Sequence, residues 1–86
     1  TPDARTDVFS LGVIAHEMLT GSLPFGRGSL ADVLLAQAKG LPPEGPEGLT
    51  PALARAVRAA LEPDPDRRPP SPQAFAHLIN AAGGWS

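Results

Sequence analysis

The stretch that decides the fold is residues 7–25, which read DVFSLGVIAHEMLTGSLPF. From residue 8 to residue 20 only His16 and Glu17 carry strongly polar side chains, and the apolar residues form no single stripe. A helix that is apolar on nearly all sides is normally buried on several of them. We therefore expect a central helix over residues 8–20 whose cover includes chain beyond these residues. A compact four-helix bundle centred on this helix is the alternative.

Three shorter helices are expected to follow, separated by loops rich in proline and glycine. Each expected helix is preceded by a hydroxyl side chain that can accept a hydrogen bond from the first turn. The expected helices and caps are residues 30–39 after Ser29, residues 51–61 after Thr50, and residues 72–82 after Ser71. For the first helix we expect a cap at Thr6 or Asp7 and an end at Gly21, and Gly83 with Gly84 is expected to end the last.

The composition supports an all-α fold. Alanine and leucine supply 14 and 11 of the 86 residues, whereas the residues typical of sheets are few. The 11 prolines and 9 glycines are expected to keep the helices short. The chain has no cysteine, which excludes disulfides and thiolate metal sites and fits a cytoplasmic protein. The net charge of −2 argues against nucleic acid as a partner, and no apolar run approaches the length of a membrane span.

Three patterns that invite a functional interpretation have a simpler explanation. His16 and Glu17 begin a His-Glu-x-x-His zinc pattern, but Thr20 stands where the second histidine would be. Residues 26–31 fit Gly-x-Gly-x-x-Ala, but no strand is expected before them, so a loop leading into a capped helix explains the glycines. The four arginines between residues 55 and 68 have carboxylates close by, which indicates a partly paired, solvated surface.

Two further motifs lie in register with the four expected helices. The first is DVFSLGVI at residues 7–14, which continues through EMLTG at residues 17–21, and the second is DPDRRP at residues 64–69. In this order and at this separation they resemble the C-terminal lobe of the serine/threonine protein kinases, in particular the bacterial eukaryotic-like branch. The resemblance covers about residues 5–79, and it implies that residues 1–86 are a partial kinase domain whose complete form is α+β.

The resemblance also implies roles for three charged residues. Asp7 matches an aspartate that accepts hydrogen bonds from the backbone of the catalytic loop, although an ordinary helix cap is the alternative and the two roles can coexist. Arg68 matches an arginine that forms an ion pair with the glutamate ending the activation segment. That glutamate is not in these residues, so we expect Arg68 to be unpaired or paired differently. Glu17 falls where several kinases place an acidic residue that meets a basic substrate side chain.

A glycine within the first expected helix points to close packing. Gly12 matches a glycine of the family, and a glycine in a helix interior costs about 1 kcal/mol relative to alanine. A helix keeps such a residue where another backbone or side chain comes too near for a Cβ atom. We therefore expect a neighbouring element to lie against the first helix at Gly12.

The catalytic signatures of the family are absent from these 86 residues. Neither His-Arg-Asp nor Asp-Phe-Gly occurs, and the only lysine, Lys39, falls in an expected surface helix. Because phosphoryl transfer needs such residues together with Mg-ATP, we expect no catalytic residue, cofactor or metal in the chain itself, and ATP and Mg only in the parent enzyme. The expected partners are the rest of the kinase domain, protein substrates, and a second copy where Phe9, Val13 or Met18 lacks cover.

The implied function is that of a supporting, substrate-facing part of a transferase that phosphorylates serine or threonine in proteins. A pseudokinase or kinase-like helical interaction module is the alternative, and it would lack the catalytic aspartate or the strand lysine upstream. An unrelated small helical domain that echoes the motifs would instead be a compact monomer that unfolds cooperatively. Because the chain begins with Thr1 rather than methionine, we expect its own start to have been removed or to lie upstream.

Overall fold

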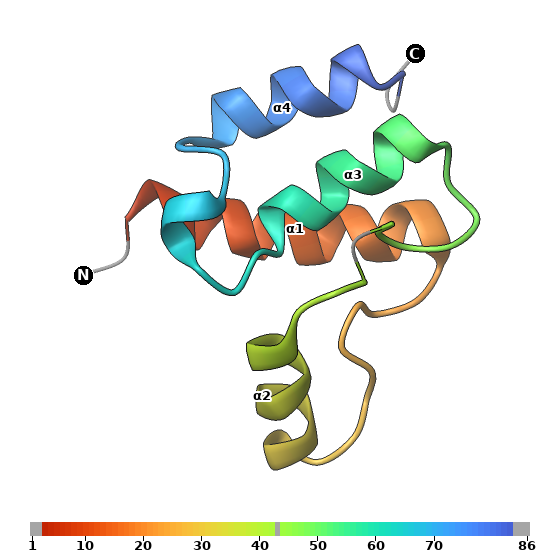
Figure 1. Ribbon diagram of the computed structural model, residues 1–86, viewed down its shortest axis with the longest axis vertical. Helices are drawn as coiled ribbons and strands as arrows, with labels where there is room; N and C mark the ends of the chain where they lie inside the picture. The colour runs from red at the N-terminus through yellow and green to blue at the C-terminus, as the bar shows by residue number, and fades with distance from the viewer. Residues whose placement is uncertain (1–2, 43, 84–86) are drawn as a thin grey trace.

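Over the residues that the structure describes, the chain forms four α-helices and one short 3-10 helix (Figure 1). The computed structural model describes residues 3–42 and 44–83, and it contains no strand within these ranges. The elements are α1 (Ala4–Thr20), α2 (Leu30–Lys39), α3 (Pro51–Ala60), η1 (Pro65–Arg67) and α4 (Pro72–Ala81). The expected all-α fold with four helices is confirmed.

Three helices begin at the caps that the sequence predicts. The hydroxyl oxygens of Ser29, Thr50 and Ser71 each accept a hydrogen bond from the backbone N–H three residues later, at 3.2, 3.3 and 3.1 Å. Proline occupies the first position of α3 and of α4, where its missing N–H is not needed. The last helical residues of α3 and α4 each lie one residue earlier than expected. The part of the predicted end of α4 that falls on Gly84 lies outside the described residues.

The predicted start of α1 is wrong by four residues. Asp3, rather than Thr6 or Asp7, caps the helix, because its Oδ1 accepts a hydrogen bond of 3.0 Å from the N–H of Thr6. Asp3 is as good a capping residue as the predicted ones, and the residues that follow it tolerate helical geometry well. The predicted end is confirmed, since Gly21 has φ of 79° and donates its N–H to the carbonyl of Glu17 at 2.8 Å.

The core forms where α1, α3 and α4 meet. Figure 1 shows α3 and α4 lying on the same side of α1, and each of these three helices contacts the other two. Burying a large aliphatic side chain contributes about 1.5–3 kcal/mol. The buried apolar residues of this cluster are Val8, Ala15, Leu53, Ala56, Val57, Ala60, Leu61, Phe75 and Ile79.

Close packing between α1 and the end of α3 explains Gly12. A Cβ atom at Gly12 would lie 2.8 Å from the Cβ of Ala60 and 3.0 Å from Cδ2 of Leu61. Such distances are shorter than ordinary van der Waals contact, so a larger residue at position 12 would push the two helices apart. The predicted close approach at Gly12 is therefore confirmed.

One side of α1 remains uncovered in the described part of the chain. Leu11, Ile14 and Met18 are 38%, 54% and 65% exposed. The prediction that Met18 lacks cover is confirmed, whereas Phe9 and Val13 are half-buried against the core. The uncovered side borders a hollow of about 270 Å³, which we call the α1–α4 groove, lined by Leu11, Ile14, Ala15, Met18, Pro72, Phe75, Ala76 and Ile79.

Helix α2 contributes no residue to the buried core. It lies apart from the other three helices in Figure 1, so α1 is not the centre of a four-helix bundle. The apolar face predicted on α2 does not cover α1, because Leu30 and Leu34 are 75% and 54% exposed and only Val33 is half-buried. Leu78 likewise points partly into solvent instead of joining the buried face of α4. Over the described residues, no helix is long and apolar enough to span a membrane.

Candidate functional site

Arg68 is the most firmly held of the three predicted site residues. It directly follows η1, and its guanidinium lies over the ring of Phe9, 4.7 Å from the ring centroid. Its Nε donates to the carbonyl of Glu62 at 2.7 Å, and its terminal nitrogens donate to the carbonyls of Arg5 and Pro63, each at 3.3 Å. These bonds join the first turn of α1 to the turn that follows α3.

Phe9 is itself fixed by a second ring. It stacks on Phe25 with the ring centroids 5.9 Å apart and the planes inclined by 1°. Phe25 lies in the loop between α1 and α2, so the stack ties this loop to α1. The result is a guanidinium that rests on an aromatic ring and is held by three backbone oxygens, which restricts its movement.

A cavity of about 400 Å³ opens beside Arg68, between α1 and α2. We call it the Arg68 cavity, and its lining residues are Thr6, Phe9, Ser10, Leu34, Gln37, Ala38, Pro63 and Arg68. A guanidinium has five N–H donors, and the three carbonyls use three of them. Among the described residues, two of the Arg68 N–H donors therefore have no acceptor. An arginine held in this way suits a carboxylate, which can accept two parallel hydrogen bonds from it.

Asp7 lies in the first turn of α1 and its side chain is exposed. The predicted capping role is wrong, since Asp3 is the cap. Within the described residues, the carboxylate of Asp7 has no hydrogen-bond or ion-pair partner. The partial positive charge at a helix N-terminus favours a carboxylate at this position, so Asp7 offers a stabilised, free acceptor to a backbone that approaches from outside.

Glu17 lies at the opposite end of α1. It is exposed in the last turn, ten residues after Asp7, which corresponds to about 15 Å along the helix axis. A carboxylate near a helix C-terminus is slightly disfavoured by the helix dipole. The structure therefore places Asp7 and Arg68 near the N-terminal half of α1, and it does not bring Glu17 to them.

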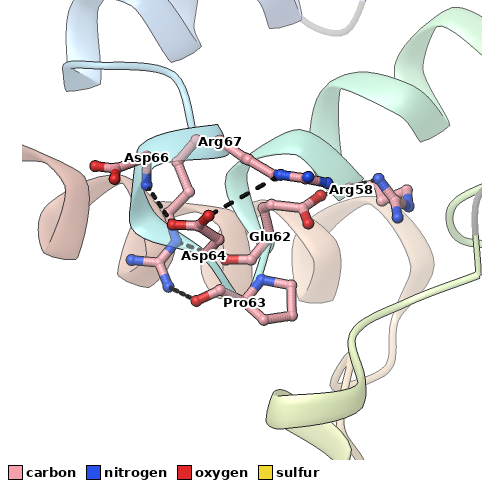
Figure 2. Close-up of polar contacts among 7 residues, drawn as sticks. Arg58, Glu62, Pro63, Asp64, Asp66 and Arg67 are labelled. Carbon is pink, nitrogen blue, oxygen red and sulfur yellow. Dashed lines mark hydrogen bonds and ion pairs between the residues drawn. The ribbon is translucent and has the colours of Figure 1, made fainter.

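A second polar cluster connects α3 to η1 (Figure 2). Arg58 forms an ion pair of 3.1 Å with Glu62, one turn later in the chain, and its Nε donates to the carbonyl of Pro42 at 2.9 Å. Asp64 caps η1 by accepting from the N–H of Asp66 at 3.0 Å, and its second carboxylate oxygen lies 4.0 Å from Arg67. The predicted partly paired surface is confirmed for Arg58 and Arg67, but the hydrogen bond from Arg58 to a distant loop was not expected.

The structure gives His16 a local role in the loop after α1. The side chain is buried, and its Nδ1–H donates to the carbonyl of Ser22 at 2.7 Å, because a carbonyl can only accept. Thr20 bonds to the same carbonyl at 3.2 Å. Over the described residues, no group of three or more histidines and carboxylates lies in a metal-binding arrangement. Residues 26–29 form the expected loop before a capped helix.

Two contacts of the site escape sequence-based prediction. The stack of Phe25 on Phe9 joins residues far apart in the chain, and the bond from Arg58 to Pro42 uses a backbone carbonyl, which no side-chain pattern reveals. The proline after the helix end at Gly40 predicts only a loop there. The motif DPDRRP is the one local signal that points to the region around Arg68.

Comparison with known proteins agrees with this arrangement. The family model described as protein tyrosine and serine/threonine kinase matches residues 2–79. Serine/threonine-protein kinase PknA of Corynebacterium glutamicum is 33% identical over 78 residues, which are 91% of this chain and 17% of the relative. Pkn1 of Myxococcus xanthus, also a serine/threonine-protein kinase, is 38% identical over 84 residues, covering 93% of this chain and 12% of the relative.

A third relative extends the same pattern. Serine/threonine-protein kinase PknJ of Mycobacterium tuberculosis is 35% identical over 85 residues, which are 93% of this chain and 14% of that protein. The chain thus spans less than a fifth of the length of these relatives. No solved structure matches the chain with comparable significance. The family match over nearly all of the sequence, and the bacterial serine/threonine kinases among its relatives, show that the chain belongs to the protein tyrosine and serine/threonine kinase family.

Proposed function

We propose that the chain forms the end of the C-terminal lobe of a bacterial serine/threonine protein kinase, with residues 1–86 as part of its kinase domain. The complete enzyme would transfer the γ-phosphate of ATP, with Mg²⁺, to serine or threonine of protein substrates in the cytoplasm. The chain itself would supply no catalytic residue and no ligand for ATP or metal. Its role is to hold the catalytic and activation segments and to face the substrate.

The observation that carries this proposal is that Asp7 and Arg68 lie near the same end of α1, without contact between them. Asp7 offers a free carboxylate at the N-terminal turn, as a backbone loop requires, and Arg68 keeps two N–H donors beside a cavity. We assign Asp7 to the backbone N–H groups of the catalytic loop and Arg68 to the acidic residue that ends the activation segment. Glu17, at the far end of α1, would meet a basic substrate side chain.

The α1–α4 groove supports the same proposal. It is lined by apolar side chains alone and spans about two turns of α1, from Leu11 to Met18, so it fits an uncharged apolar helix face. Because the matched relatives are at least five times as long as the matched segment, we propose that the rest of the kinase domain covers this groove. A second copy of the chain would occupy it only when that cover is missing.

The test is phosphotransfer by the full-length protein, measured with γ-labelled ATP, Mg²⁺ and a protein substrate. Asp7→Ala is expected to lower kcat about ten- to a hundredfold, because a catalytic loop shifted by about 1 Å loses that much rate. Asp32→Ala is the matched control, since Asp32 is also an exposed carboxylate in the first turn of a helix. Equal kcat for Asp7→Ala and wild type would refute the role of Asp7.

One observation favours a second candidate function, a kinase-like interaction module without phosphotransfer. Leu30 and Leu35 on α2 are 75% and 71% exposed, and exposed apolar residues that gather on one element often mark an interface. The same assay separates the two functions. A folded full-length protein that transfers no phosphate would refute the kinase and favour the module.

A further inference from the structure

The position of α2 is set by its flanking loops. No residue of helix α2 is fully buried, so packing fixes its direction only weakly. On its N-terminal side the stack of Phe25 on Phe9 holds the preceding loop. On its C-terminal side Gly40 ends the helix with φ of 80° and lies so close to Pro63 that an added Cβ would be 3.1 Å from the proline ring. Helix α2 is therefore attached to the rest of the protein by one contact at each end.

Arg58 forms the polar part of the C-terminal attachment. Its Nε donates to the carbonyl of Pro42, two residues beyond Gly40, and its terminal nitrogen binds Glu62. The planar guanidinium can make both contacts at once, which a lysine ammonium in the same place could not do with the same geometry. The pair is partly shielded from water, with 31% of the Arg58 side chain and 15% of the Glu62 side chain exposed.

Glu62 connects this attachment to the candidate site. Its carboxylate binds Arg58, and its carbonyl accepts the shortest hydrogen bond of Arg68. One residue thus positions both arginines. The Arg68 cavity has Thr6, Phe9 and Ser10 of α1 on one side and Leu34, Gln37 and Ala38 of α2 on the other. If α2 moves away from α1, the cavity widens.

We propose that Arg58 is a positioning residue that sets the width of the Arg68 cavity by tethering the C-terminal end of α2. The role of the cavity as the seat of the activation segment rests on the function proposed above, whereas the tether itself does not. Arg58 touches no substrate. Its hydrogen bond to Pro42 holds the end of α2, and its ion pair with Glu62 holds the turn that contacts Arg68.

The tether is tested by hydrogen exchange of backbone amides in the full-length protein. Arg58→Gln is expected to raise exchange in residues 30–42 about three- to tenfold, because it removes the hydrogen bond to Pro42 that holds this segment and the ion pair with Glu62 that orients the Arg58 side chain. Arg55→Gln is the matched control, since Arg55 lies one turn earlier on α3 and is exposed. Exchange in α3 and α4 should stay unchanged in both variants.

Two further variants keep the test decisive if Arg58→Gln folds poorly. Arg58→Lys keeps the charge opposite Glu62 but cannot reach both acceptors, so exchange in residues 30–42 should still rise. Glu62→Gln keeps the carbonyl that holds Arg68 and loses only the ion pair, so the rise should be smaller. Unchanged exchange in α2 for all three variants, or an equal rise for Arg55→Gln, would overturn the proposal.

Kinetics test the consequence for the cavity. Arg58→Gln is expected to raise KM for the protein substrate about threefold or more, with KM for ATP unchanged. The reason is that the activation segment, which binds in the Arg68 cavity, would no longer be held in one position. A fall in kcat alone, with both KM values unchanged, would contradict control of the cavity. If the wild-type protein transfers no phosphate, the proposed function fails, and the exchange experiment still decides whether Arg58 is the tether.

Discussion

Replacement of Gly12 by alanine tests how closely α1 and α3 pack. Two effects oppose each other at this position. Alanine is favoured over glycine in a helix by about 1 kcal/mol, so without any contact the substitution would stabilise the protein. The new Cβ, however, would lie 2.8 Å from the Cβ of Ala60 and 3.0 Å from Leu61. Ordinary contact begins at 3.4 Å, so the helices must separate by about 0.6 Å.

Overpacking of this kind costs about 1–3 kcal/mol. After the gain in helix propensity of about 1 kcal/mol is subtracted, the expected net change is a destabilisation of up to about 2 kcal/mol. The assay is chemical denaturation of the complete kinase domain followed by circular dichroism, with the slope of the transition held constant between variants. A stabilisation by Gly12→Ala would refute the close approach.

A double substitution identifies the contact. Ala60→Gly removes the atom that the new Cβ meets, so Gly12→Ala combined with Ala60→Gly should be more stable than the sum of the two single changes by about 1 kcal/mol. Gly21→Ala is the control. Gly21 has φ of 79° with no atom within 4 Å of an added Cβ, so its cost is purely conformational. Its effect should simply add to that of Ala60→Gly.

Two further predictions concern the ends and the uncovered side of α1. The isolated 86-residue chain is expected to self-associate in sedimentation experiments. Ile14→Ser should weaken the association about tenfold, whereas Leu35→Ser on α2 should not. A monomer that melts cooperatively would contradict the role of the α1–α4 groove. The hydrogen bond from the Thr6 N–H lowers the pKa of the Asp3 carboxyl below its ordinary value of 3.8. The stabilisation of α1 by ionised Asp3 is therefore complete above pH 3.8, and it is lost as the pH falls through the lowered pKa of Asp3 in the folded protein. Helicity measured by circular dichroism should fall there in the wild type, and an equal fall in Asp3→Asn would show that Asp3 is not responsible.

The sequence predicts the helices well because their signals are local. Ser29, Thr50 and Ser71 each have a capping oxygen, and two of them precede a proline, so both features act within one turn. The start of α1 could not be predicted in the same way, since Asp3, Thr6 and Asp7 are all acceptable caps. The added first turn, residues 4–7, is exposed or half-buried, so no apolar pattern marks its start.

Which apolar faces become buried is less predictable. Leu30 and Leu34 share a helix face with Val33, and nothing in that spacing shows that the loops hold α2 away from α1. Family resemblance identifies the motif residues Asp7 and Arg68, but the three carbonyls around Arg68 come from two segments far apart in the chain, Arg5 in α1 and Glu62 with Pro63 after α3. Such contacts depend on tertiary arrangement and leave no periodic pattern in the sequence.

The separation of α2 from the core has an evolutionary consequence. Substitutions on α1, α3 and α4 must preserve interlocking volumes, so selection for foldability constrains most of their positions. Residues 30–39 escape that constraint, because none of them is buried. We expect this helix to diverge fastest among related kinases, except at Leu34, Gln37 and Ala38, which line the Arg68 cavity. The same scaffold could then acquire new partners through α2 while Arg58 and Gly40 keep the changing helix in its place.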